Sequence, residues 1–123
     1  MVRIYPIFVL AEEINESQMN YSEAISWCYD NLNNPRVFVL QEEDIYFIQQ
    51  KTCILDIINE EGDCMLQVGE DDWIISNEIK KRIYERFMTY IQDSSQKLKT
   101  YLNPIIDLFS IAIKENKNIY FLF

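Results

Sequence analysis

Acidic residues in short runs are the side chains of this sequence that are most able to do chemistry. The densest run is Glu70, Asp71 and Asp72, which stands directly before Trp73. The other runs are Glu12-Glu13, Glu42-Glu43-Asp44, and Glu60-Glu61 with Asp63. Such runs can hold a cation, act in acid–base catalysis, face a positively charged partner or keep a surface soluble.

Residue types that are absent or rare narrow these four possibilities. The chain has no histidine, which removes the commonest general base and the usual activator of serine or cysteine nucleophiles. Two glycines are too few for a phosphate-binding loop. Cys28, Cys53 and Cys64 show no C-x-x-C spacing, so we interpret them as reduced core residues rather than a disulfide across a hairpin.

Two metal-binding patterns were compared with the acidic runs. A calcium loop counted from Asp56 fails, because its third and twelfth positions are Ile58 and Gln67. Residues 78–80 and 115–117 both spell E-x-K, as in the metal-binding core of restriction-type nucleases. This pattern is short, and the first copy opens a predicted helix, so we interpret it as helix-end charge with solvated lysines. The sequence predicts no metal and no cofactor.

The charge is divided unevenly along the chain. The formal net charge is −9, yet residues 4–79 contain sixteen acidic residues against Arg36 and Lys51, a local balance of −14. Residues 80–123 contain eight basic and four acidic residues, a balance of +4, and Arg3 adds one more positive charge. A negative field of this strength repels nucleic acid and anionic membranes and speeds encounter with a basic protein.

The spacing of apolar residues predicts one α+β domain over residues 1–123. It consists of a mostly antiparallel meander of five to six strands, with one N-terminal and two C-terminal helices packed on one face. The candidate strand segments, from which these five to six strands are drawn, are 2–10, where Pro6 favours an edge or bulge, and 36–40, 44–48, 53–58, 64–68, 73–75 and the final NIYFLF. The acidic runs then fall in exposed turns.

Capping signals and helical spacing predict the helices. Asn20 followed by Glu23 begins a helix that ends near residues 33–35. A second helix begins after Ser76 and breaks or bends near residues 93–95. Asn103-Pro104 is predicted to open a third, buried helix that runs to about Glu115. No stretch is apolar enough to span a bilayer, and the opening residues do not fit a signal peptide, so we expect a soluble cytoplasmic protein.

Aromatic residues are the second informative type. Eight tyrosines and two tryptophans suit a protein interface as well as a core. Trp27 recurs at helical spacing with Ile25 and Leu32, so we expect it in the core. Trp73 adjoins the densest acidic run, and both a core position and an interface position remain open for it.

The whole profile resembles the small acidic immunity proteins of contact-dependent and polymorphic toxin systems in bacteria. The resemblance lies in the chain length, the acidic segments EED, NEEGD and GEDDW, the many tyrosines and the absence of histidine. It implies a non-enzymatic cytosolic inhibitor, or antitoxin, that binds its toxin tightly. Carboxylate clusters would imitate the phosphates that a basic nuclease groove accepts.

We therefore predict binding to a basic protein, a cognate toxin nuclease domain, with neither nucleic acid nor membrane as a partner. The predicted partner-binding residues are Glu42, Glu43, Asp44, Glu60, Glu61, Asp63, Glu70, Asp71, Asp72 and Trp73. Two alternatives remain open: a hydrolase that uses carboxylates or a divalent ion, and an adaptor subunit of a larger assembly. The oligomeric state is not predicted.

Overall fold

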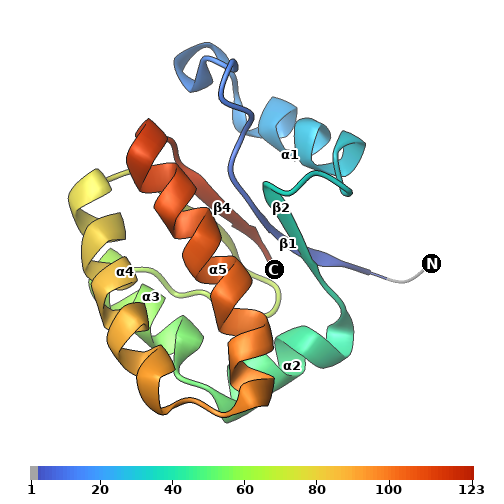
Figure 1. Cartoon of the computed structure of the whole chain (residues 1–123). Helices are drawn as coiled ribbons and strands as arrows, with labels where there is room; N and C mark the ends of the chain where they lie inside the picture. The colour runs from blue at the N-terminus through green and yellow to red at the C-terminus, as the bar shows by residue number, and fades with distance from the viewer. Residues whose placement is uncertain (1–2) are drawn as a thin grey trace.

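The computed structural model describes residues 3–123, in which four antiparallel strands form one sheet (Figure 1). The strands are β1 (Tyr5–Phe8), β2 (Val37–Leu40), β3 (Asp71–Ile74) and β4 (Ile119–Leu122). Their order is β2-β1-β4-β3, so β1 and β4 are central and β2 and β3 are the edges. All residues of β1 and β4 are buried, as expected for central strands covered on both faces.

Alternation along the central strands divides the core into two clusters. Ile7 and Phe121 point to the larger cluster, whereas Phe8 and Tyr120 point to the smaller one. The rings of Phe8 and Tyr120 stack at 4.8 Å. Since successive side chains of a strand face opposite ways, the sheet carries a layer on each side. The prediction of helices on only one face is therefore wrong.

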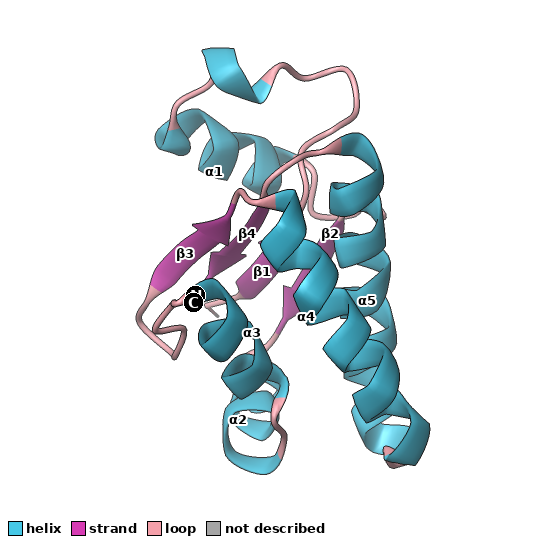
Figure 2. Ribbon diagram, turned by 90° about the vertical axis from the view of Figure 1, so that its left-hand side faces the viewer, coloured by secondary structure: helices cyan, strands magenta, loops and turns pink. Residues whose placement is uncertain are grey.

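The smaller cluster is covered by α1 (Tyr21–Asp30), which follows a short 3₁₀ helix, η1 (Glu16–Gln18). Figure 2 shows α1 apart from the other helices. The side chain of Asn20 accepts from the backbone of Glu23, and the Glu23 carboxylate accepts from the backbone of Asn20. This reciprocal pair is the capping box that the sequence predicted. Trp27 is half-buried and packs against this cluster.

The larger cluster lies under α3 (Ile54–Gly62), α4 (Asn77–Tyr90) and α5 (Gln96–Glu115), with η2 (Ile91–Asp93) between the last two. The hydroxyl of Ser76 accepts a hydrogen bond from the backbone N–H of Ile79, and that of Ser95 accepts one from the N–H of Leu98. These two N-caps begin α4 and α5. The predicted start of the last helix at Asn103-Pro104 is wrong, because Pro104 lies inside α5. Pro104 removes the donor for the Thr100 carbonyl, and this is tolerated because Thr100 is exposed.

Two of the predicted strands are helices. Residues 44–48 lie in α2 (Glu42–Lys51) and residues 53–58 lie in α3 (Ile54–Gly62), while residues 64–68 form an irregular loop. In α3 the buried side chains are Ile54, Leu55, Ile57 and Ile58, a spacing that suits one helical face as well as a buried strand. The α+β class is confirmed, with four strands in residues 3–123 in place of five to six.

The first strand is shorter than predicted and is central. Pro6 pairs with Val39 of β2, whereas the β1–β4 ladder begins only at Ile7. The missing N–H of Pro6 therefore costs no ladder hydrogen bond to β4, which corrects the prediction of an edge or bulge. Val2, where that predicted strand began, lies outside the described residues. Among the helices of residues 3–123, none is both long and apolar enough to cross a membrane.

Candidate functional site

The antiparallel register brings two of the predicted acidic runs to one end of the sheet. Tyr5 at the start of β1 pairs with Leu40 at the end of β2, and Asp71 at the start of β3 pairs with Leu122 at the end of β4. Acidic residues lie beside both pairs, after β2 and at the start of β3. We call these four residues the acidic end: Glu42, Glu43, Glu70 and Asp71.

The carboxylates of the acidic end are open to solvent. All four residues are exposed, and within residues 3–123 none of them forms an ion pair with a lysine or arginine. The two edge strands are separated by three interstrand spacings, roughly 14 Å. The acidic end is therefore a pair of negatively charged edges rather than one compact cluster.

Asp71 is joined to two aromatic residues on the α1 side of the sheet. The hydroxyl of Tyr21 donates to Asp71 Oδ2 at 3.2 Å, and the rings of Tyr21 and Trp73 lie 4.9 Å apart. Burial, followed by the negative charge of Asp71, raises the pKa of Tyr21. Trp73 keeps 39% of its surface exposed, so it lies at the surface of an edge strand and outside the core.

Two other carboxylates of the predicted set hold the fold together. Asp44 accepts from the backbone of Gln41 and from the hydroxyl of Tyr101, both at 2.8 Å. The hydrogen bond to Asp44 is the main cause of the raised pKa of Tyr101. Asp72 lies within β3 and accepts from the backbone N–H of Trp73 at 2.8 Å. These two groups are less free to meet a partner than their neighbours are.

The third predicted run, at the end of α3, is paired with cations of α4. Glu61 bonds to Arg82 and Arg86, each at 3.1 Å, and Glu60 bonds to Arg86 at 2.9 Å. Asp63 follows α3 in the left-handed conformation, with φ of 51°, and is exposed. Much of the negative charge of this run is balanced inside the molecule. The acidic runs are thus not all turn tips, because most lie in helices or in β3.

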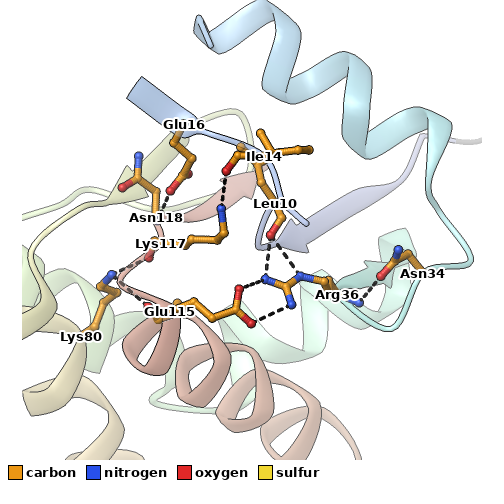
Figure 3. A network of polar contacts seen from close by, with 10 residues as sticks. Leu10, Ile14, Glu16, Asn34, Arg36, Lys80, Glu115, Lys117 and Asn118 are labelled. Atoms are coloured by element: carbon orange, nitrogen blue, oxygen red, sulfur yellow. Dashed lines mark hydrogen bonds and ion pairs between the residues drawn. The ribbon is translucent and has the colours of Figure 1, made fainter. Parts of the chain in front are cut away.

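At the opposite end of the sheet, the carboxylates of Glu16 and Glu115 are engaged on both oxygens (Figure 3). Arg36 forms a bidentate pair with Glu115, with its Nη2 atom 2.5 Å from Oε1, and also donates to the carbonyl of Leu10. Glu16 accepts from the backbone of Asn118 and from the hydroxyl of Tyr120. We call this region, centred on Glu16, Arg36 and Glu115, the paired end. It fastens the segment that precedes α1 to the end of α5.

The two E-x-K patterns belong to this same structural region. Lys80 is fully buried and donates to the carbonyl of Lys117, and burial lowers the pKa of Lys80. Lys117 in turn donates to the carbonyl of Ile14 at 2.6 Å, while Glu78 pairs with Arg82 one turn along α4. These contacts support structural roles, although the two lysines are buried and not solvated as expected. Residues 3–123 contain no cluster of three histidine, cysteine or acidic residues that could hold a metal.

The cysteines lie in three different environments. Cys28 is buried and Cys64 half-buried, but Cys53 is exposed at the start of α3, so the expectation of three core thiols is wrong for Cys53. Cys53 and Cys64 flank α3 and do not face each other across a hairpin. Burial raises the pKa of Cys28 to about 12, and burial together with Asp72 raises the pKa of Cys64 to about 11. These two thiols are poor nucleophiles at neutral pH.

Three exposed apolar residues near the acidic end were missed by the sequence analysis. They are Tyr46 of α2 and Met65 and Val68 of the loop between α3 and β3. Tyr46 was placed in a strand, although its neighbours Ile45 and Ile48 are buried at helical spacing. A helical assignment of residues 41–51 would have placed Tyr46 on the outer face. No sequence signal marks Met65 or Val68 as exposed.

Comparisons with known proteins give a consistent result. A family model described as DMP12, DNA-mimic protein, matches residues 4–123. The chain is 26% identical over 117 residues to the DNA mimic protein DMP12 of Neisseria meningitidis serogroup B, covering 95% of this chain and 94% of that protein. A solved structure of a Neisseria DNA mimic protein DMP12 superposes with a TM-score of 0.79 at 24% identity, covering 98% of this chain and all of the other.

These matches overturn the predicted function. The resemblance to immunity proteins is wrong, and so are the roles of toxin inhibitor and antitoxin in contact-dependent inhibition, because the family model and the relative are DNA mimics. The alternatives of a hydrolase and an adaptor subunit are equally unsupported by these matches. The predicted toxin nuclease partner is also wrong. So is the exclusion of nucleic acid, since this family is named for its imitation of DNA.

Proposed function

This chain belongs to the DMP12 family of DNA-mimic proteins, and we propose that it occupies the DNA-contacting surface of a basic DNA-binding protein. The acidic end supplies the contact, with Glu42 and Glu43 on one side and Glu70 and Asp71 on the other. Their carboxylates take the positions that DNA phosphates would take on lysines and arginines of the partner.

The arrangement of the acidic end carries this proposal. The edge strands lie roughly 14 Å apart, by three interstrand spacings. This separation is close to the width of the DNA major groove, about 12 Å, across which two rows of phosphates face each other. Two acidic groups at the two edges of one sheet therefore offer a basic surface two separate sets of negative charge, as the two backbones of a duplex do. The Arg82 and Arg86 pairs keep Glu60 and Glu61 from adding equally to this surface.

The remaining predicted residues take secondary places in the proposed site. Asp63 is exposed at the end of α3, in the segment that leads to Glu70, and adds negative charge there. Trp73 packs against Tyr21 with their rings tilted, and it offers an amphipathic surface next to Asp71. Asp44 keeps its hydrogen bonds to Gln41 and Tyr101 and ties α2 to α5, while Asp72 keeps a local hydrogen bond to the backbone of Trp73. The family description supports a binding role without catalysis.

We also propose that the chain acts as one domain in the cytoplasm. Both apolar clusters share the central strands β1 and β4, so neither layer has a complete core without the other. DNA-binding proteins of bacteria work in the cytoplasm, where a protein that competes with DNA must meet them.

A competition experiment tests the proposed function. Proteins of the source cell are first collected on duplex-DNA resin, eluted with salt, desalted and applied to the immobilised chain. We expect the chain to retain DNA-binding proteins and free duplex DNA to release them. A variant with Glu42→Gln, Glu43→Gln, Glu70→Gln and Asp71→Asn should retain far less, because it lacks the charges that the partner's cations meet.

The matched control removes the same number of charges elsewhere. Glu13, Glu85, Asp93 and Asp107 are exposed and lie outside the acidic end, so their amide variant has the same net charge. It should retain the DNA-binding proteins. Equal losses in both variants would mean that net charge alone causes retention. Retained proteins that duplex DNA does not release would contradict the imitation of DNA.

A further inference from the structure

Exposed apolar side chains lie beside the acidic carboxylates. Tyr46 is 63% exposed, Met65 is 78% exposed and Val68 is 43% exposed. Single exposed apolar residues are common on protein surfaces and need no explanation. These three residues differ because their positions are linked to one another and to the carboxylates.

The loop that carries Met65 and Val68 is held firmly. The side chain of Asn59 accepts from the backbone N–H of Leu66 at 2.7 Å and donates to its carbonyl at 3.1 Å. Leu66 itself is buried, and the N–H of Gly69 donates to the carbonyl of Phe123 at 2.7 Å. The backbone is thus fixed on both sides of Val68 while Met65 and Val68 face solvent. A loop without a role in contact could bury these side chains or replace them with polar ones.

One hydrogen bond connects the loop to α2, and a shallow hollow on α2 connects Tyr46 to the acidic end. The side chain of Gln49 in α2 accepts from the backbone N–H of Val68 at 3.0 Å. Tyr46, one helical turn before Gln49, lines a shallow hollow of about 410 Å³ together with Glu42 and Glu43. On the other side, Glu70 follows Val68 by two residues. The loop that carries Val68 is therefore hydrogen-bonded to α2 one helical turn from Tyr46, and it leads directly to Glu70.

We propose that Tyr46, Met65 and Val68 form an apolar contact within the partner-binding surface, so that the occupant is a basic surface bearing apolar side chains. This proposal rests on the proposed function and specifies its partner. A partner surface rich only in lysine or arginine would pair with the carboxylates but leave the three apolar side chains exposed to water. Burying them adds affinity that salt does not screen, which is how a phosphate mimic can select among basic proteins.

Charge disfavours a second copy of this chain as the occupant. A contact through the same surface of two copies would bring Glu42, Glu43 and Glu70 of each close to those of the other. Like charges across an interface are unfavourable unless cations balance them. The same carboxylates favour an occupant whose rim is basic.

Two synthetic peptides of equal length and equal lysine content test the proposal. In one peptide glycine alternates with lysine, and in the other leucine alternates with lysine. The wild-type chain should bind the leucine peptide about tenfold more tightly, as expected for burial of a few apolar groups. The Met65→Ser/Val68→Ser variant should bind both peptides alike. The Glu42→Gln/Glu43→Gln variant should bind both more weakly while keeping the preference.

The control variant is Ile75→Ser/Met88→Ser. Both residues are exposed, at 62% and 41%, and lie outside this surface, so the control should keep the tenfold preference. Circular dichroism and urea unfolding establish that the variants fold.

The proposal is overturned if the Met65/Val68 variant keeps the preference or if the wild type shows none. It is also overturned if sedimentation reveals a dimer that this variant abolishes. In those cases the competition experiment with duplex DNA still tests the proposed function independently.

Discussion

The two ends of the sheet carry carboxylates of the same kind in opposite surroundings. At the paired end, Glu115 meets Arg36 and Glu16 meets two donors of the β4 segment, so their charges are balanced inside the molecule. At the acidic end, Glu42, Glu43 and Glu70 are exposed without a cation partner in the described chain. The difference shows that a carboxylate becomes available to a partner through the lack of an internal partner, and not through its place in an acidic run.

Carboxylates within one acidic run also differ in whether they are hydrogen-bonded inside the molecule. Asp44 is held by Gln41 and Tyr101, whereas Glu42 and Glu43 in the same helical turn are free. In β3 the carboxylate of Asp72 turns back to the N–H of Trp73, while Asp71 faces the α1 side. Adjacent acids therefore have different tasks. This comparison predicts which substitutions alter folding and which alter only binding.

Replacing Glu115 should give the largest effect on stability. The hydrogen bonds from Arg36 hold the pKa of Glu115 below its ordinary value of 4.5, which means that folding favours its charged form. The stabilisation is therefore complete above the ordinary pKa and is lost as the pH falls through the lowered pKa of the folded state. Glu115→Gln should lower the free energy of unfolding by about 2 kcal/mol at neutral pH.

Urea unfolding of both proteins over a range of pH measures this effect. The difference between wild type and Glu115→Gln should shrink below pH 4.5, because only the wild type has a carboxylate at position 115 that becomes neutral there. Glu13→Gln, at an exposed site, serves as the control and should unfold like the wild type. A difference that stays constant in acid would show that the carboxylate charge has no part in holding the paired end.

Asp44→Ala should give an intermediate effect. The substitution removes the acceptor for the backbone of Gln41 and for the hydroxyl of Tyr101, so we expect a loss of about 1 kcal/mol. Glu43→Ala, one residue earlier in the same helix, should change stability much less. Thermal unfolding of the two variants compares them directly. Equal losses would mean that Asp44 is as unconstrained as its neighbour and would remove the distinction within this run.

The sequence was sufficient to predict the elements whose signals are local. The capping box of Asn20 and Glu23, the helix start after Ser76 and the interruption near residues 93–95 are each contained within a few residues. The structure confirms the first two and shows the interruption to be a break and not a bend. The meander failed because short apolar runs do not distinguish a buried strand from one face of a helix. In α3 the helix was decided by packing against α4, which a local pattern does not contain.

Of the candidate site, the sequence alone predicted the acidic chemistry but not which carboxylates are free. The acidic runs indicated carboxylates that imitate phosphates, but the predicted class of protein was wrong, because acidity and abundant tyrosine do not distinguish one kind of acidic binding protein from another. The pairing of Glu16 with Tyr120 joins residues 104 positions apart, and that of Arg36 with Glu115 joins residues 79 apart. No local pattern reveals such pairs, so free and engaged carboxylates could not be told apart.

Neutralising the acidic end should give the smallest effect on stability, although it should have the greatest effect on binding. Two contributions oppose each other in the variant with amides at Glu42, Glu43, Glu70 and Asp71. The first turn of α2 loses negative charges that the helix dipole favours, while repulsion among like charges is relieved. The free energy of unfolding should therefore change by less than about 0.5 kcal/mol.

The salt dependence of unfolding distinguishes these electrostatic contributions from a structural role of the acidic end. Both contributions are electrostatic and exposed, so any difference from the wild type in urea unfolding should shrink as salt is added. The amide variant of Glu13, Glu85, Asp93 and Asp107 provides the comparison at equal net charge. A loss as large as that expected for Glu115→Gln, and unchanged by salt, would mean that the acidic end holds the fold. The contrast between the two ends would then fail, because both sets of carboxylates would be engaged within the molecule.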